Sequence, residues 1–285
     1  MPRRLNLGCG FDHRPGHLNV DFLEAHHPDL RADVRDLSML PSDSFEAAVA
    51  QDVLEHLKRV DVVPALREWR RVLAPGGLLE IRTLDVIGAA DLLRQRDGTA
   101  FHQHMINCLY GTQAYTGDYH LVGFTDLTLV DDLFEAGFDR VRISRRDQWL
   151  LDARARRPSG RDQPDWIAIG LDSGFYMQES DGRDSWRWCD AVAGILLFSR
   201  YREAVDVHLQ LDLFRPTGEI EIELTGCGVG QRVPVGRSTT VSSTRTLIPG
   251  SNRLSLMSHG EAVPSREDPR SLHVQLRAIR ATPVL

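Results

Sequence analysis

Short apolar runs alternate with amphipathic stretches over the first 172 residues of the chain. Strand-sized runs occupy residues 4–8, 17–21, 47–51, 77–83 and 140–144. In residues 61–73 the apolar side chains recur at spacings of three and four, which predicts a helix with Asp61 as its cap. Residues 125–138 repeat this pattern, with Thr125 as the cap and Gly137 as the stop. Strands that alternate with helices predict a doubly wound α/β fold, a largely parallel sheet covered on both faces.

From residue 173 onward the period of the pattern changes to two. In residues 204–214 every second side chain is apolar and the intervening ones are polar. Residues 219–226 and 271–279 show the same alternation, and glycine or proline residues separate the segments. Half-buried strands of this kind are typical of antiparallel sheets. The pattern therefore predicts a separate all-β domain, a β-sandwich.

The boundary between the two domains falls near a stretch rich in arginine, proline and glycine, residues 153–165. This stretch has the composition of a linker. Residues 165–172 then form one more apolar run, which reads as a further strand of the first sheet. We therefore interpret residues 153–165 as a long hairpin loop and expect the domains to be 1–172 and 173–285.

Composition and charge exclude several classes of protein. The chain has 285 residues, of which 42% are hydrophobic and 26% are charged, and its net charge of −6 argues against a nucleic-acid partner held by bulk electrostatics. The cysteines form no C-x-x-C pair, so we expect neither a zinc site nor a disulfide framework. No apolar run has the length of a signal peptide or of the roughly 18 residues of a membrane span. We expect a cytoplasmic protein without membrane insertion.

The first strand-sized run ends in Gly8-Cys9-Gly10, and glycines at this place let a ligand approach the backbone closely. A dinucleotide site would need a third glycine, a helix facing the pyrophosphate and an acid about 20 residues on. Position 13 is a histidine, and the distance to Asp21 leaves little room for a full helix. A nucleoside without pyrophosphate fits better, with Asp21 placed to accept from ribose hydroxyls. A simple tight turn stays open as the alternative.

Two further segments, residues 36–57 and 70–83, follow in the order known from one enzyme family. Together with the opening "LNLGCG…G…NVD" they closely resemble the class I S-adenosylmethionine-dependent methyltransferases, in a bacterial group with this opening. The resemblance covers residues 5–138. It implies a seven-stranded, Rossmann-like doubly wound sheet whose last strand is antiparallel, and S-adenosyl-L-methionine as the cofactor.

The same resemblance implies a set of cofactor-binding positions. Asp21 falls on the ribose, and Asp36 falls where an acid accepts from the adenine amino group, beside the Leu37 backbone. Gln51 and Asp52 end a strand under the methionine, although relatives often carry histidine at the second position. A turn or helix-cap residue is the alternative for Asp36. The full set is Leu7, Gly8, Cys9, Gly10, Asp21, Asp36, Leu37, Gln51 and Asp52.

Methyl transfer to a hydroxyl requires that the acceptor be aligned and lose a proton, a task that suits histidine near neutral pH. His120 lies in an aromatic-rich irregular segment, where similar methyltransferases carry a tyrosine–histidine pair, here Tyr119 and His120. We expect His120 to be the catalytic base, with a loop anchor as the alternative reading. His56 is the second candidate, although a structural role suits it better. Tyr119, Tyr115 and His104 are expected in the acceptor pocket, and no metal site is expected.

Residues 173–190 combine aromatic and charged side chains, as sugar-binding sites do. Alternatively, Trp186 and Trp188 face inward on one strand and fill the β-domain core. This segment and residues 268–279 look like a β-sandwich module of bacterial surface-polysaccharide enzymes. We therefore expect O-methylation of a sugar hydroxyl on a surface glycan or its precursor, and leave a homo-oligomer open. The alternatives are a small-metabolite methyltransferase with a dimerising β-domain and a catalytically silent glycan-binding or scaffold protein.

Overall fold

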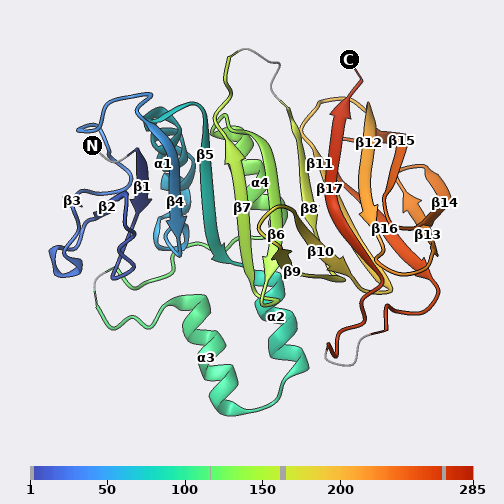
Figure 1. Ribbon diagram of the computed structural model, residues 1–285. Coiled ribbons are helices and arrows are strands. Elements are labelled where there is room, and N and C mark those ends of the chain that lie inside the picture. Colours follow the sequence, from blue (N-terminus) through green and yellow to red (C-terminus); the bar gives the residue numbers. More distant parts are fainter. Residues whose placement is uncertain (1–2, 116, 161–164, 265–267, 285) are drawn as a thin grey trace. The chain divides into compact units, whose positions relative to one another are not determined.

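The computed structural model describes residues 3–115, 117–160, 165–264 and 268–284 (Figure 1). The chain divides into two compact units, Met1–Pro164 (unit 1) and Asp165–Leu285 (unit 2). This division falls earlier in the chain than the boundary that we expected after residue 172. The reason is that the strand expected over residues 165–172, β8 (Ile167–Leu171), pairs antiparallel with β11 (Val192–Ser199) of unit 2.

Unit 1 is built on a sheet in which the strands follow in the order β3-β2-β1-β4-β5-β7-β6. Neighbouring strands from β3 to β5 are parallel, and β7 is antiparallel to both β5 and β6. β1 lies between β2 and β4, so the direction of the connections reverses there, and ligands of such sheets bind at the carboxyl ends of the strands. The strands are β1 (Arg4–Leu7), β2 (His17–Asp21), β3 (Leu30–Arg31), β4 (Phe45–Gln51), β5 (Leu73–Leu84), β6 (Asp139–Arg146) and β7 (Leu150–Arg156).

The two helices expected from the periodicity are present as α1 (Arg59–Val72) and α4 (Asp126–Glu135). The Thr125 cap of α4 is confirmed, because its hydroxyl accepts from the Thr128 amide at 3.2 Å. The cap expected for α1 is wrong. This helix begins at Arg59, so that Asp61 lies inside its first turn and pairs with Arg35 at 3.0 Å. The periodicity did not indicate α2 (Val86–Gln95) or α3 (Thr99–Tyr110).

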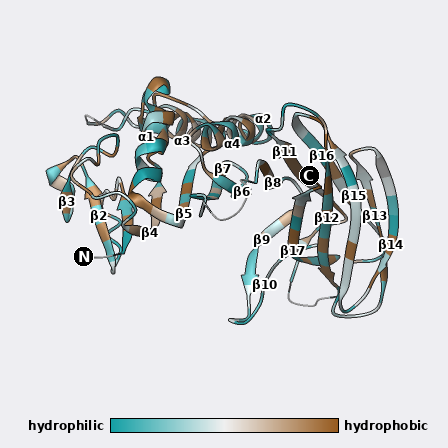
Figure 2. Cartoon of the chain, turned by 90° about the horizontal axis from the view of Figure 1, so that it is seen from above, coloured by the Kyte–Doolittle hydropathy of each residue, from teal (hydrophilic) through white to brown (hydrophobic). Residues whose placement is uncertain are grey.

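Helices on both faces of the sheet were expected, and this expectation needs correction. α1 and α4 contact each other and lie on the same face of the strands (Figure 2). The connections 8–16 and 32–44 contain no described helix, and residues 22–29 contain only the short 3-10 helix η1 (Glu24–His26). These connections are too short or too irregular to place helices on the other face.

The stretch interpreted as a hairpin loop begins inside a strand. Residues 153–156 belong to β7, in which Leu151, Ala153 and Ala155 are buried while Arg154 and Arg156 are exposed. Asp147 and Gln148, both at positive φ, form the tight turn that joins β6 to β7. Within the interpreted loop, residues 161–164 lie outside the described residues.

Unit 2 contains two antiparallel sheets, β14-β13-β16-β11-β8 and β15-β12-β17-β10-β9. The alternation expected over residues 204–214 is confirmed in β12, where Val205 and Val207 are buried and Asp206 and His208 are exposed. Both sheets contribute side chains to one hydrophobic cluster. The remaining strands are β9 (Phe175–Ser180), β10 (Ser185–Cys189), β12 (Val205–Phe214), β13 (Ile220–Gly226), β14 (Val229–Val235), β15 (Thr239–Leu247), β16 (Gly250–His259) and β17 (Val274–Pro283).

Candidate active site

A cavity of about 370 Å³ lies in unit 1, at the carboxyl ends of β1, β2 and β4. Its walls come from the segments that follow these strands, from the segment after β3, and from Tyr115, Gly117 and Leu121. This is the edge of the sheet at which the reversal between β1 and β4 predicts a ligand. Among the described residues no helix is both long and apolar enough to span a membrane, and no group of three histidine, cysteine or acidic side chains is placed to hold a metal ion.

The two glycines after β1 serve different purposes. Both have positive φ, +62° for Gly8 and +49° for Gly10. A Cβ atom on Gly8 would lie 2.6 Å from Val53 Cγ2, whereas a Cβ atom on Gly10 would meet no atom within 4 Å. Gly8 is therefore required for packing, and Gly10 keeps space open on the cavity wall. Leu7 and Cys9 are buried, and burial raises the pKa of the Cys9 thiol to about 11, so both act as packing residues beside the wall.

Asp21 lines the cavity at the end of β2, as the sequence predicts, and its carboxylate is buried. One oxygen, Oδ2, accepts from the Gly10 amide at 2.9 Å and lies 3.1 Å from Nδ1 of His26. The other, Oδ1, accepts from the Leu23 amide at 2.9 Å. Asp21 thus fixes the glycine turn against β2, and each of its oxygens retains capacity to accept a further bond.

The acid at the cavity wall after β3 is Asp33 rather than Asp36. Asp33, Val34 and Arg35 line the cavity, and the Arg35 guanidinium beside Asp33 holds the pKa of that carboxyl below its usual range. Asp36 is exposed and accepts from the Ser38 amide at 3.0 Å, an arrangement that fits the alternative of a turn residue. Leu37 is buried away from the cavity, and its amide donates to Glu68 at 3.1 Å.

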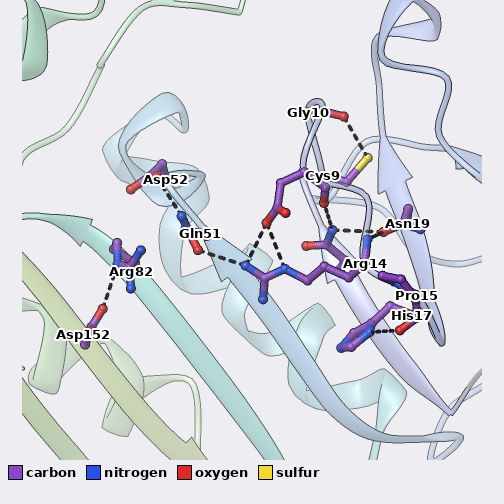
Figure 3. Close-up of polar contacts among 12 residues, drawn as sticks. Cys9, Gly10, Arg14, Pro15, His17, Asn19, Gln51, Asp52, Arg82 and Asp152 are labelled. Atoms are coloured by element: carbon purple, nitrogen blue, oxygen red, sulfur yellow. Dashed lines mark hydrogen bonds and ion pairs between the residues drawn. The ribbon is translucent and has the colours of Figure 1, made fainter. Parts of the chain in front are cut away.

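At the end of β4, Gln51 and Asp52 have different environments (Figure 3). Gln51 accepts from Nη2 of Arg14 at 2.9 Å and is not part of the cavity wall. Asp52 lines the cavity at a φ of +55°, which is uncommon for a residue other than glycine. Its amide donates to the Arg82 carbonyl at 2.9 Å, and burial raises the pKa of its carboxyl. Asp52 is therefore a carboxyl at the cavity wall whose backbone has an uncommon conformation and whose pKa is raised.

His56 and His120, the two candidate catalytic residues, are in contact. Their ring centroids lie 4.7 Å apart in an edge-to-face arrangement. His56 lines the cavity from η2 (Leu54–His56). His120 does not line the cavity, but its ring contacts the ring of His56. Nδ1 of His56 lies 3.2 Å from the Tyr119 carbonyl oxygen, which can only accept, so this contact assigns the His56 proton to Nδ1. Burial, and then the neighbouring His56, lower the pKa of His120. His120 is therefore neutral and able to accept a proton at pH 7.

The residues expected in the acceptor pocket are only partly brought together. Tyr115 lines the cavity, and Tyr119 is half exposed and contributes its backbone to the His56 contact. His104 lies on α3, with its ring 6.4 Å from that of Trp149 and Nε2 3.6 Å from the Cys108 thiol. It does not line the cavity.

Several site residues were missed in the sequence. His26 and Phe22 line the cavity, and Arg14 and Glu55 support it from behind. For Phe22, its position directly after the strand that ends in Asp21 was an available signal. The others join segments far apart in the chain, and no local pattern marks them.

Residues 5–81 match the family model described as a methyltransferase domain. A search of curated proteins found no match. Among solved structures, a possible exported protein from Bordetella parapertussis is 16% identical over 54% of this chain and 61% of that chain, with a TM-score of 0.42. A 1,6-didemethyltoxoflavin N1-methyltransferase from Burkholderia thailandensis, solved with 1,6-didemethyltoxoflavin and S-adenosylhomocysteine, is 18% identical over 54% and 70%, with a TM-score of 0.38. An S-adenosylmethionine-dependent methyltransferase from Methanosarcina mazei is 18% identical over 54% and 92%, with a TM-score of 0.41. The family match includes most of the segments that line the cavity.

Proposed function

We propose that this chain is a class I S-adenosylmethionine-dependent methyltransferase and that it methylates a hydroxyl group with His120 as the general base. The contact between His120 and the cavity-lining His56 carries the proposal. A hydroxyl is a poor nucleophile until it loses its proton, and a neutral imidazole next to the cavity can take that proton.

The residues of the cavity wall fit the cofactor. Gly10 leaves open the space that a Cβ atom would fill, so a ligand can lie against its backbone. Asp21 would accept from the ribose hydroxyls and Asp33 from the adenine amino group, while Asp52 would lie at the methionine end. When bound, S-adenosylmethionine supplies an electrophilic methyl group on a positively charged sulfur.

Two histidines of the chain would then remove the proton from the acceptor hydroxyl, one as the base and one as its support. His56, with its proton on Nδ1, keeps the His120 ring in place from one side. The lowered pKa of His120 keeps that ring neutral at pH 7, so that it can receive the hydroxyl proton as the new oxygen–carbon bond forms. Carboxyl groups at Asp52 and Asp118 interact favourably with the imidazolium that results.

For the acceptor we propose a sugar hydroxyl of a bacterial surface glycan or of its precursor. The resemblance of unit 2 to modules of surface-polysaccharide enzymes supports this class, and so do the half-exposed rings of Tyr115 and Tyr119 beside the cavity. In unit 2, Trp188 is buried, which fits the reading of a core residue, and Trp186 is half buried. A small-metabolite acceptor with unit 2 serving dimerisation is the alternative.

Transfer of a labelled methyl group tests the reaction. The protein is incubated with methyl-labelled S-adenosylmethionine and matched panels of glycan precursors and small metabolites, and the labelled atom is located by mass spectrometry and NMR. We expect the label on a sugar oxygen. A label on nitrogen or carbon, or on small metabolites alone, would contradict the proposal.

The reassignment from Asp36 to Asp33 gives a paired prediction. Asp33→Ala is expected to weaken S-adenosylmethionine binding by about 1–3 kcal/mol, because a buried amino group of the ligand loses its acceptor. Asp36→Ala is expected to leave the affinity unchanged, because Asp36 points to solvent and stabilises a turn. Isothermal titration measures the S-adenosylmethionine affinity of both variants. A loss of affinity in Asp36→Ala but not in Asp33→Ala would make Asp36 the adenine contact.

Cofactor binding is also expected to need unit 1 alone, because every proposed contact precedes residue 122. A fragment that ends at Pro164 should bind S-adenosylmethionine with the affinity of the full chain. Circular dichroism shows whether the fragment is folded. A folded fragment without affinity would mean that unit 2 helps to build the site.

A further inference from the structure

The segment beside His56 contains a buried acid that the proposed reaction does not use. Glu55 lies in the middle of η2 and is only 3% exposed. Its Oε2 accepts from the hydroxyl of Thr83 at 2.9 Å, and Thr83 is fully buried on β5. Among the residues that the structure describes, no ion pair includes Glu55. An acid in such surroundings is costly to ionise.

The backbone of the same residue holds the loop that carries His120. The carbonyl oxygen of Glu55 accepts from the amides of Leu121 at 2.7 Å and Val122 at 3.2 Å. Together with the contact between His56 and the Tyr119 carbonyl, these bonds tie residues 119–122 to η2. Glu55 thus links η2 to β5 through its side chain and to the loop through its carbonyl oxygen.

The groups around the Glu55 side chain favour its neutral form. Burial, together with the Asp52 carboxylate at the end of β4, raises the pKa of Glu55 to about 8. Hydrogen bonds from Thr83 and from the backbone amide of Glu55 act in the opposite direction. His56 follows directly in η2. The acid is therefore mostly protonated at pH 7.

We propose that Glu55 is a positioning residue, whose neutral side chain anchors η2 to β5 and thereby holds the His120 loop against His56. This inference rests on the proposed role of His120. Ionisation would place a charge in the interior next to Leu54, and the side chain would be drawn toward water. Movement of Glu55 would weaken the bonds from its carbonyl to the loop.

The direction of the pH dependence follows from the raised pKa. Between the ordinary value of 4.5 and about 8 the folded chain binds more protons at Glu55 than the unfolded chain. Stability therefore falls as pH rises through this window. Activity and order in the loop should fall as pH rises through about 8, where Glu55 loses its proton in the folded state.

The test compares Glu55→Gln, Glu55→Ala and Glu80→Gln with the parent protein from pH 6 to 10. Glutamine keeps the shape of a permanently neutral acid, and Glu80, accessible on β5 and paired with Arg154, is the matched control. The readouts are kcat and the protection of the Leu121 and Val122 amides from hydrogen exchange, each relative to an unstructured peptide at the same pH.

We expect Glu55→Gln to keep the activity and the protection of the parent at pH 7 and to lose the decline above pH 8. Glu55→Ala should lose at least tenfold in both readouts, and Glu80→Gln should follow the parent. Equal losses in Glu55→Gln and Glu55→Ala would overturn the proposal, and so would a parent profile without a decline. If His120 is not the base, the exchange measurement still decides the role of Glu55, because it does not depend on methyl transfer.

Discussion

Replacement of His120 by alanine is expected to lower kcat by about 10²–10⁴-fold, the usual contribution of a general base. The affinity for S-adenosylmethionine should stay nearly unchanged, because His120 is not part of the cavity wall. In the parent protein kcat should rise with pH as His120 loses its proton. The lowered pKa of His120 places this rise below pH 6.5, and the variant should lack it. Steady-state kinetics across pH and isothermal titration measure the two effects.

His208→Ala is the control for this prediction, since His208 is exposed on β12 of unit 2 and should tolerate the change. If His120→Ala keeps its turnover and its pH profile, His120 is a loop anchor, and His56 becomes the candidate base. If affinity for the cofactor falls in step with kcat, the residue shapes the pocket and does not move a proton.

Replacement of Gly10 by valine is expected to reduce the affinity for S-adenosylmethionine strongly. The new side chain would occupy the open space on the cavity wall and force the ligand away, at a cost of about 1–3 kcal/mol or roughly 5- to 150-fold in Kd. Titration calorimetry measures the loss.

Gly16→Val separates this effect from backbone strain. Gly16 lies in the same connection, has a φ of +77° and has no atom within 4 Å of its virtual Cβ, but it does not line the cavity. Both variants should lose comparable thermal stability, and only Gly10→Val should lose the ligand. Equal affinities of the two variants for S-adenosylmethionine would mean that the cofactor does not bind at the Gly8–Gly10 turn.

The features that the sequence predicts well are those with a local cause. The period of three and four in α4, with Thr125 as its cap, depends on contacts within a few residues, and so does the alternation in β12. Gly10 and Asp21 could be paired from the sequence because a glycine turn after one strand and an acid at the end of the next meet at the same sheet edge. Both positions line the cavity as expected.

The missed features depend on tertiary surroundings. Asp33 and Asp36 stand three positions apart in an irregular segment without periodicity, and only the fold decides which one faces the cavity. β7 alternates small alanines with arginines, so its buried face carries little apolar signal. Glu55 shows no sign in the sequence of being buried, because its environment is built by Thr83 and by the loop at residues 121–122.

Helices were expected on both faces of the sheet of unit 1, and this expectation failed because several connections between its strands are short or irregular. A glycine turn followed closely by Asp21 already left little room for a helix between β1 and β2. The same reasoning applied to residues 22–29 and 32–44 would have predicted a sheet with one helical face. Strand and helix alternation alone does not reveal which connections carry the helices.

A calorimetric titration of the full chain with S-adenosylhomocysteine tests the central claim most directly, because it requires no knowledge of the acceptor. The arrangement of Gly10, Asp21 and Asp33 around one cavity predicts saturable binding of one molecule per chain, weakened in Gly10→Val and retained in Gly16→Val. Absence of binding to the folded parent protein, or binding that Gly10→Val leaves intact, would contradict it.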